Sequence, residues 1–102
     1  MKLTRAEFHV LLALQHGSRH GYAVMQDVED LSEGRVRLGP GTLYTAIKRL
    51  VAAGLIEECE ADAERRRCYQ LTRLGKAAAA DEARQMSDLV RVARKRGLLS
   101  PS

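Results

Sequence analysis

Small hydroxyl and cationic side chains recur along one side of residues 38–56. At about 100° per residue, Thr42, Thr45 and Arg49 fall on a single helical face, and Lys48 lies at its edge. Hydroxyl, ammonium and guanidinium groups donate hydrogen bonds to the phosphate oxygens and base edges of DNA. A helix with this polar face is therefore a candidate for insertion into the major groove of DNA.

The same stretch contains the signals that begin, dock and end a helix. Pro40 suits the first helical position, and Gly54 suits the left-handed conformation that often ends a helix. Leu43, Ile47 and Leu50 form an apolar face opposite the polar one. Ordinary amphipathic surface helices share this pattern, so the rest of the chain must decide whether the polar face binds DNA.

The only two cysteines, Cys59 and Cys68, could carry a second kind of chemistry. If a hairpin pairs Ile56 with Leu71, the two cysteines face each other across antiparallel strands. Directly opposed cysteines can form a reducible disulfide that senses oxidants. Two reduced thiols are the commoner state in a cytosolic protein, and the sequence leaves both states open.

The remaining residues do not have the spacing of a catalytic or metal site. His9, His16 and His20 are the only histidines, the two cysteines lie far from them in the sequence, and no Cys-x-x-Cys pattern is present. The sequence also lacks a phosphate-binding glycine loop and an evident nucleophile–base pair. We therefore expect no metal, no cofactor and no enzymatic activity.

Charge is distributed unevenly along this chain of 102 residues, which has a net charge of +4. Residues 57–64 contain five acidic residues and no basic one, whereas residues 65–102 contain ten Lys or Arg against three acidic residues. A polyanion would therefore meet Arg65, Arg66 and Arg67 rather than the acidic run. No segment is apolar for long enough to span a membrane, and we expect a cytoplasmic protein.

The first half of the chain predicts three short helices. Thr4 and Glu7 fit a capping box that begins a helix ending near His16. A second helix is expected over about Gly21 to Leu31, and the 38–56 stretch contains the third. Between the second and third helices, Arg35 to Leu38 alternates polar and apolar residues and is interpreted as a short extended piece.

The second half predicts a hairpin and a long helix. Leu55 to Glu60 and Arg66 to Leu71 are interpreted as two strands, followed by a helix over about Arg73 to Arg96 with Thr72 as its N-cap. The fold class is thus mainly α with a small β-hairpin. Three helices and a two-stranded wing make a winged helix-turn-helix, in which the third helix enters the major groove. We assign the DNA-binding domain to residues 1–72 and a dimerisation helix with its tail to residues 73–102.

The long helix has an apolar seam that suggests a partner. Its seam residues follow alternating spacings of four and three, which is the pattern of helix pairing. The seam could instead pack on the chain's own first three helices, but the helix is longer than they are and the seam continues to its far end. The residues expected in a dimer interface are Ala79, Ala83, Met86, Leu89, Val90 and Ala93.

At this point the chain resembles the PadR family of bacterial transcriptional regulators, in its short form with a single C-terminal helix. The residues that carry the resemblance lie in order over about 3–76. They are His20-Gly21-Tyr22, Gly41-Thr42-Leu43-Tyr44, Lys48-Arg49-Leu50, Gly54-Leu55-Ile56, Arg66 to Thr72, and Gly75.

The resemblance implies a homodimeric winged-helix repressor that binds a near-palindromic operator in double-stranded DNA and is often released by a small molecule. It implies DNA contacts from the recognition helix, from Tyr22 near the backbone, and from the wing arginines Arg65, Arg66 and Arg67. In the recognition helix it points to Thr42, Tyr44, Lys48 and Arg49.

Several features leave other interpretations open. Tyr22 and Tyr44 could be packing residues, and Tyr69 is expected in the core. The wing is short, its first strand is acidic, and no aromatic residue follows Tyr69, so a flat ligand held between aromatic side chains of the dimer helices is not expected. The alternative function is a winged-helix module for protein interaction or dimerisation that does not read DNA.

Overall fold

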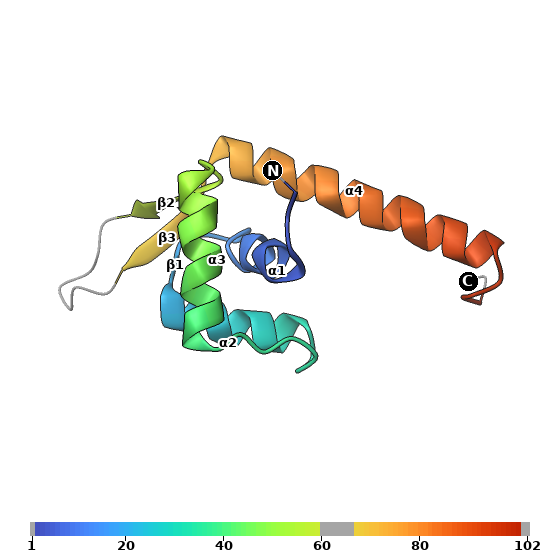
Figure 1. The fold of residues 1–102 in the computed structure, drawn as a ribbon, viewed down its shortest axis with the longest axis horizontal. Helices are drawn as coiled ribbons and strands as arrows, with labels where there is room; N and C mark the ends of the chain where they lie inside the picture. The colour runs from blue at the N-terminus through green and yellow to red at the C-terminus, as the bar shows by residue number, and fades with distance from the viewer. Residues whose placement is uncertain (1, 60–66, 101–102) are drawn as a thin grey trace.

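Helices α1 to α3 surround a common core, a small sheet lies beside them, and a long fourth helix follows (Figure 1). The structure is a computed structural model, and it describes residues 2–59 and 67–100. Its elements are α1 (Arg5–Ala13), β1 (Arg19–His20), α2 (Gly21–Leu31), α3 (Pro40–Ala52), β2 (Ile56–Cys59), β3 (Cys68–Leu71) and α4 (Arg73–Lys95).

Apolar faces of the first three helices meet in one core. Each helix places apolar residues three or four positions apart on its inner side. Burying one large apolar side chain stabilises the fold by about 1.5–3 kcal/mol. Tyr69 closes the core from the sheet, as expected from the sequence. Core members from the helices include Val10, Leu11, Leu14, Val24, Val28, Leu43, Ile47 and Leu50.

Local capping explains where α1 and α2 begin and end. The predicted capping box is present, because the Thr4 hydroxyl accepts from the Glu7 N–H and the Glu7 carboxylate accepts from the Thr4 N–H. The expectation that this helix reaches His16 was wrong, since α1 ends at Ala13 and turns follow. Helix α2 has its predicted bounds and ends where the chain turns through positive φ at Glu33 and Gly34.

The sheet has three strands in the described chain, in the order β1-β3-β2. Strands β2 and β3 pair with Ile56 opposite Leu71, which is the register that the sequence offered as the condition for opposed cysteines. The prediction of a two-stranded wing missed β1, a two-residue strand that pairs antiparallel with β3. The extended piece expected at Arg35 to Leu38 is not assigned as a strand in the described part of the chain.

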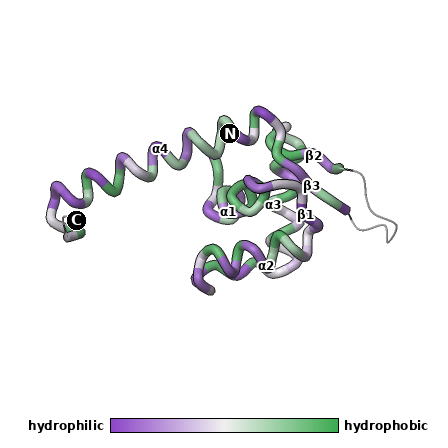
Figure 2. The backbone as a smooth tube through the Cα atoms, turned by 180° about the vertical axis from the view of Figure 1, so that it is seen from behind, coloured by the Kyte–Doolittle hydropathy of each residue, from purple (hydrophilic) through white to green (hydrophobic). Residues whose placement is uncertain are grey.

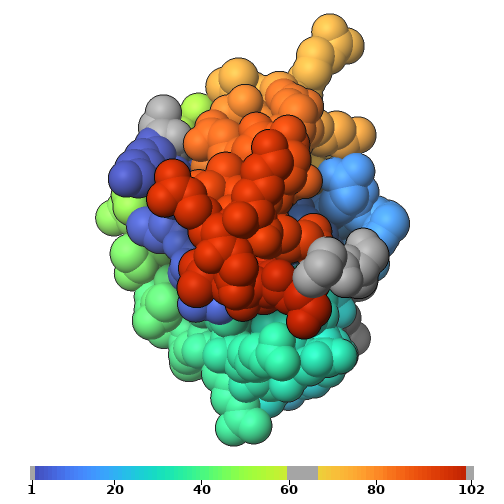
Figure 3. All heavy atoms as spheres, turned by 90° about the vertical axis from the view of Figure 1, so that its right-hand side faces the viewer, coloured from blue at the N-terminus to red at the C-terminus, as the bar shows by residue number. Residues whose placement is uncertain are grey.

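Helix α4 begins against the domain and then leaves it. Thr72 caps its first turn, and the Thr72 hydroxyl accepts from the Gly75 N–H at 3.0 Å. A side-chain Cβ at Gly75 would lie 1.9 Å from the Leu55 carbonyl oxygen, so only glycine lets the two backbones approach so closely. The second half of α4 projects beyond the other helices (Figure 1), and Figure 3 looks along it from its free end.

Candidate nucleic-acid interface

Helix α3 buries one face and exposes the other, as the sequence predicts. Leu43, Ile47 and Leu50 are buried in the core, together with Ala46. The polar face lies outside, and its members Thr42, Thr45, Lys48 and Arg49 are all exposed. The structure therefore presents two hydroxyls and two cations side by side on a helix that is fixed from behind.

A shallow cleft separates α3 from the start of α1. Its volume is about 490 Å³, and its walls include the N-cap Thr4 and Glu7 at the start of α1 and Thr42, Thr45 and Arg49 of α3. Polar side chains from the start of α1 and from α3 therefore border the same open surface. The cleft continues the polar face of α3 towards the N-terminus of α1.

A buried carboxylate joins α1 to the polar face of α3. The Glu7 side chain is only 1% exposed, and its Oε2 lies 3.0 Å from Nη1 of Arg49, whose side chain is 52% exposed. The other oxygen, Oε1, accepts the Thr4 N–H at 2.8 Å. The sequence indicates only the capping role of Glu7, because nothing local to Glu7 or Arg49 predicts a contact between positions 42 residues apart.

Two tyrosines lie where α2 begins beside α3. Tyr22 is 74% exposed and Tyr44 is 50% exposed, so neither is a core residue. A Cβ at Gly21 would come within 2.7 Å of the Tyr44 hydroxyl oxygen, which shows that the Tyr44 ring lies against the first turn of α2. Tyr44 thus has one side packed on the domain and the other in solvent.

The wing presents acidic and basic groups together at its base. Arg67 is exposed, and its Nη1 lies 3.6 Å from Oε1 of Glu58 on the opposite strand. Burial raises the pKa of the Tyr69 hydroxyl above its ordinary value, and a hydrogen bond from the Arg67 side chain partly offsets that rise. Arg67 therefore has partners in the protein itself. Arg65 and Arg66, the other two predicted wing contacts, lie outside the described residues.

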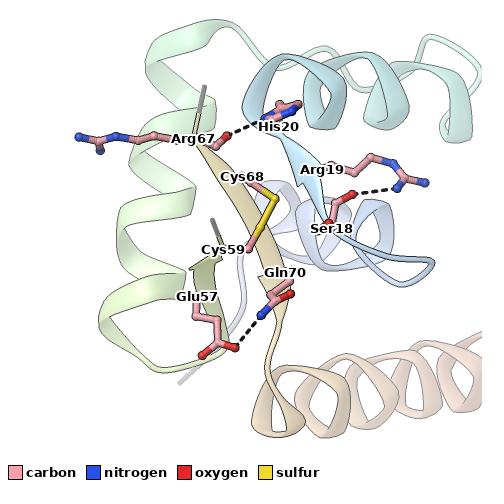
Figure 4. The surroundings of a disulfide bond; sticks show 8 residues. All are labelled: Ser18, Arg19, His20, Glu57, Cys59, Arg67, Cys68 and Gln70. Carbon is pink, nitrogen blue, oxygen red and sulfur yellow. Dashed lines mark hydrogen bonds between the residues drawn. A yellow bond between two sulfur atoms is a disulfide. The ribbon is translucent and has the colours of Figure 1, made fainter. Parts of the chain in front are cut away.

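A disulfide joins β2 to β3 at the last pair of the ladder (Figure 4). Cys59 and Cys68 are direct partners in the register, and their Cα atoms are 5.1 Å apart. The face-to-face placement expected from the sequence is confirmed. Of the two states that the sequence left open, the structure contains the disulfide.

The apolar seam of α4 divides into two parts. Ala79 is partly buried against the chain's own core, as in the alternative interpretation of the seam. Met86, Leu89 and Val90 are exposed, and Leu89 is 69% exposed. Hydrophobic and hydrophilic residues alternate along this part of the helix in Figure 2. The distal part thus has an apolar stripe that this chain leaves uncovered.

Two clefts flank α4 where it passes α1. One has a volume of about 410 Å³ and is lined by Leu11 and Leu12 of α1 and by Ala79 and Ala83 of α4. The other has a volume of about 480 Å³ and includes Met86 of α4 in its lining. The seam residues Ala83 and Met86 therefore border clefts between α4 and the domain.

Neither a membrane span nor a metal site is found among the described residues. Within residues 2–59 and 67–100, no helix is long and apolar enough to cross a membrane. The same part of the chain contains no group of three or more His, Cys, Asp or Glu side chains that could hold a metal ion.

Comparison with protein families gives a match over most of the chain. The model of the transcriptional regulator PadR-like family matches residues 10–81. A transcriptional regulator of Mycobacterium tuberculosis is 36% identical over 87 residues, which are 83% of this chain and 68% of the relative. An uncharacterised protein from a Streptomyces fradiae transposon is 39% identical over 89 residues; these cover 87% of this chain and only 25% of that protein's length.

Solved structures share the fold. The crystal structure of a PadR family transcription regulator from Clostridium difficile superposes with a TM-score of 0.78 over 90% of this chain and 97% of that chain. The two sequences are 20% identical, so this likeness shows a common winged-helix architecture.

Proposed function

This chain belongs to the PadR-like family of transcriptional regulators, and we propose that it acts as a repressor that binds a near-palindromic DNA operator as a homodimer. Members of this family regulate transcription through DNA and are not enzymes. The finer statements, which are repression, operator symmetry and dimerisation, are our proposal. We also expect the protein to work in the cytoplasm, where its DNA target would be.

The observation that carries the proposal is the polarity of α3. Its apolar face is buried, so the helix has a fixed orientation, and its exposed face combines Thr42 and Thr45 with Lys48 and Arg49. In helix-turn-helix proteins the second helix of the motif lies in the major groove and is held there by contacts of the flanking elements to the DNA backbone. Hydroxyls and cations suit both kinds of contact.

Arg49 is proposed to bind DNA while its guanidinium stays paired with the Glu7 carboxylate. A guanidinium has five N–H donors, and the contact with Glu7 Oε2 leaves others for a phosphate or a base. The ion pair restricts the Arg49 side chain before DNA arrives, which lowers the entropy lost on binding. Glu7 would therefore support DNA binding without touching DNA.

The exposed tyrosines support contacts beside the groove. The Tyr22 side chain stands mostly in solvent at the start of α2, and Tyr44 is half-exposed next to it. Phenolic hydroxyls at this position could reach the phosphate backbone on one side of the groove. On the wing, Arg67 is the described residue that we expect to contribute a basic contact, and we extend the same proposal to Arg65 and Arg66 from the sequence alone.

Dimerisation is proposed through α4. Met86, Leu89, Val90 and Ala93 continue one face of the helix with spacings of three and four, and Ala83 precedes them. Covering these side chains with the same stripe of a second copy would remove their apolar surface from water. A two-fold dimer would present two copies of α3 about one helical turn, or ~34 Å, apart on DNA.

One feature favours the alternative of an interaction module that does not read DNA. Glu57 and Glu58 are exposed on β2, and carboxylates there would repel a phosphate backbone. A basic protein partner would instead be attracted to this edge. The following experiment separates the two functions.

The proposal can be tested by selecting DNA from a random duplex pool with the full chain. We expect enrichment of an inverted repeat, followed by a competitor-resistant gel shift whose affinity falls steeply as salt rises. A gel shift with a DNA fragment that contains the promoter of the protein's own gene examines whether the target lies there. An absence of any enriched sequence would favour the interaction module.

A further inference from the structure

The β-ladder itself brings the two cysteines together. Cys59 and Cys68 are opposite each other in the register, so both side chains lie on the same face of the sheet. This placement depends on backbone pairing of Ile56–Cys59 with Cys68–Leu71 and on the core beneath it, not on the sulfur–sulfur bond. After reduction, the rest of the ladder would return the thiols to each other whenever their ends separate, so the bond could form again without refolding.

The two sulfurs differ in access. Cys68 is only 8% exposed and lies in the middle strand of the sheet, between β1 and β2. Cys59 is partly exposed and lies in the edge strand β2. An external thiol or disulfide would therefore meet Cys59 first, and Cys68 would be the partner that completes the exchange.

The bond lies close to the residues that we propose to bind DNA. Cys68 pairs with His20, which directly precedes Gly21 and Tyr22 at the start of α2. Arg67 precedes Cys68, and its carbonyl oxygen lies 3.4 Å from Nδ1 of His20 (Figure 4). The state of the disulfide therefore bears on how firmly the base of the wing is held beside α2.

We propose that Cys59 and Cys68 form a reversible thiol–disulfide site that exchanges with low-molecular-weight thiols and their disulfides, and that the oxidised form binds DNA more tightly. The part of this proposal that concerns DNA rests on the proposed function. The exchange chemistry does not.

The reaction balances with a small disulfide as the oxidant. The Cys59 thiolate attacks one sulfur of the small disulfide, forms a mixed disulfide and releases one small thiol. The Cys68 thiolate then attacks the Cys59 sulfur, forms the protein disulfide and releases the second small thiol. Two electrons pass from the protein sulfurs to the small disulfide, and the two protons of the cysteines end on the released thiols. Reduction is the reverse sequence.

The expected change in DNA affinity follows from how firmly the paired ends of β2 and β3 are held together. With the bond present, the last pair of the ladder cannot separate, and the backbone of Arg67 stays next to β2 and His20. With the bond reduced, the ends can fray, and DNA binding must then supply the ordering. Pre-ordering a short binding segment changes affinity by about threefold to tenfold.

The exchange is tested on the full chain in buffers of graded glutathione to glutathione disulfide ratio. Free thiols are trapped with a maleimide and counted by intact mass. We expect the chain to pass between zero and two trapped cysteines in both directions without denaturant. A disulfide that stays closed at every ratio until the chain unfolds, or thiols that never close again, would overturn the proposal.

Single variants test the assigned roles. Cys68→Ser leaves the accessible sulfur and should accumulate a mixed disulfide with glutathione at Cys59. Cys59→Ser leaves the buried sulfur and should accumulate less of it at the same ratio. Equal labelling of both variants, with unchanged circular dichroism, would contradict the order of attack.

DNA affinity is then measured by fluorescence anisotropy with a duplex selected by the oxidised chain. We expect the reduced wild type to bind about threefold to tenfold more weakly, and the Cys59→Ser/Cys68→Ser double variant to bind like the reduced form in every buffer. Equal affinity of the two wild-type forms would refute the switch alone. Failure of both forms to bind any duplex would refute the proposed function and with it the switch, whatever the thiol count shows.

Discussion

Helices α1 to α3 and the distal half of α4 have similar apolar spacing but opposite surroundings. In the domain, Leu43 and Leu50 are completely buried, whereas on α4 Leu89 is 69% exposed. Leu98, just after α4, is also exposed. The periodicity of a sequence therefore shows that a helix has an apolar face, but it does not show whether that face is covered by the same chain.

The difference has a simple physical origin. The three short helices are joined by short connections, so their apolar faces can meet in one core. Helix α4 extends for 23 residues from its contact with the domain, and α1 is too short to cover it. The first three helices therefore cover one another's apolar faces, whereas the end of α4 is left exposed for the second copy that we propose.

The largest effect is expected at the contact that joins the two regions. Gly75→Ala would place a Cβ against the Leu55 carbonyl oxygen, and neither backbone can move without shifting α4 or β2. We expect the free energy of unfolding to fall by about 3 kcal/mol or more. Urea unfolding followed by circular dichroism measures this loss.

Gly41→Ala is the matched control for this substitution. A Cβ at Gly41 has no neighbour within 4 Å, and alanine is a better helix former than glycine by about 1 kcal/mol. Its stability should therefore stay constant or rise. Equal losses in the two variants would mean that the close approach at Gly75 is unimportant.

The next largest effect is expected on self-association. Val90→Glu places a carboxylate in the exposed apolar stripe, where a partner helix would have to desolvate it. We expect dimerisation to weaken by about a hundredfold or more, and DNA binding to weaken with it. Sedimentation equilibrium measures the first effect and anisotropy the second.

Ala77→Glu introduces the same charge on the opposite face of α4, where the residue is also exposed. It should leave the dimer intact. If Val90→Glu associates as strongly as this control, the distal half of α4 is not the dimer interface, and the contrast between the two regions loses its explanation.

Intermediate effects are expected on the polar face of α3. Lys48→Ala should weaken DNA binding by about 1 kcal/mol and reduce the salt dependence by about one phosphate contact, because Lys48 is exposed. It should leave stability unchanged. Parallel binding curves for wild type and variant across a salt series would count against this placement of the helix.

Arg49→Ala should weaken DNA binding in the same way and also destabilise the fold. Loss of the guanidinium leaves the buried Glu7 carboxylate without its ion pair, which costs about 1 kcal/mol after allowing for the half-exposed position of Arg49. A double-mutant cycle with Glu7→Gln isolates the coupling. Additive losses in both stability and affinity would show that Glu7 does not hold Arg49 for DNA.

The smallest effect on stability is expected at Gly21. Gly21→Ala would meet the Tyr44 hydroxyl, the mobile end of a half-exposed side chain, and Tyr44 can swing away at a cost below about 1 kcal/mol. If Tyr44 contacts DNA, affinity should still fall, by about the same amount as in Tyr44→Phe. Wild-type affinity in both variants would assign Tyr44 to packing alone.

Much of the fold follows from local signals in the sequence. The bounds of α2 and the start of α4 were predicted because caps and apolar spacing coincide there, as at Thr72. The β2–β3 register, with Ile56 opposite Leu71, was only a condition in the reasoning from sequence, because neither strand alternates cleanly. Strand β1 was missed because two residues, Arg19 and His20, have no periodicity to read.

The exposed residues of the candidate site could be predicted from the sequence, but the contacts that hold them in place could not. The polar face of α3 could be listed from helical spacing, since exposure follows from the burial of the opposite face. The Glu7–Arg49 ion pair and the position of Tyr44 against Gly21 depend on how two helices cross. No local pattern encodes that crossing. The capping box accounts for one oxygen of Glu7 and does not indicate that the other contacts Arg49.

The central claim is that α4 brings two copies of α3 to one DNA site. Sedimentation velocity of a fluorescent duplex, selected with the full chain and titrated with it, counts the chains on each DNA molecule. We predict a complex of two chains per duplex, which assembles cooperatively for the wild type and is lost for Val90→Glu. A saturating complex of one chain per duplex, formed equally well by both proteins, would contradict it.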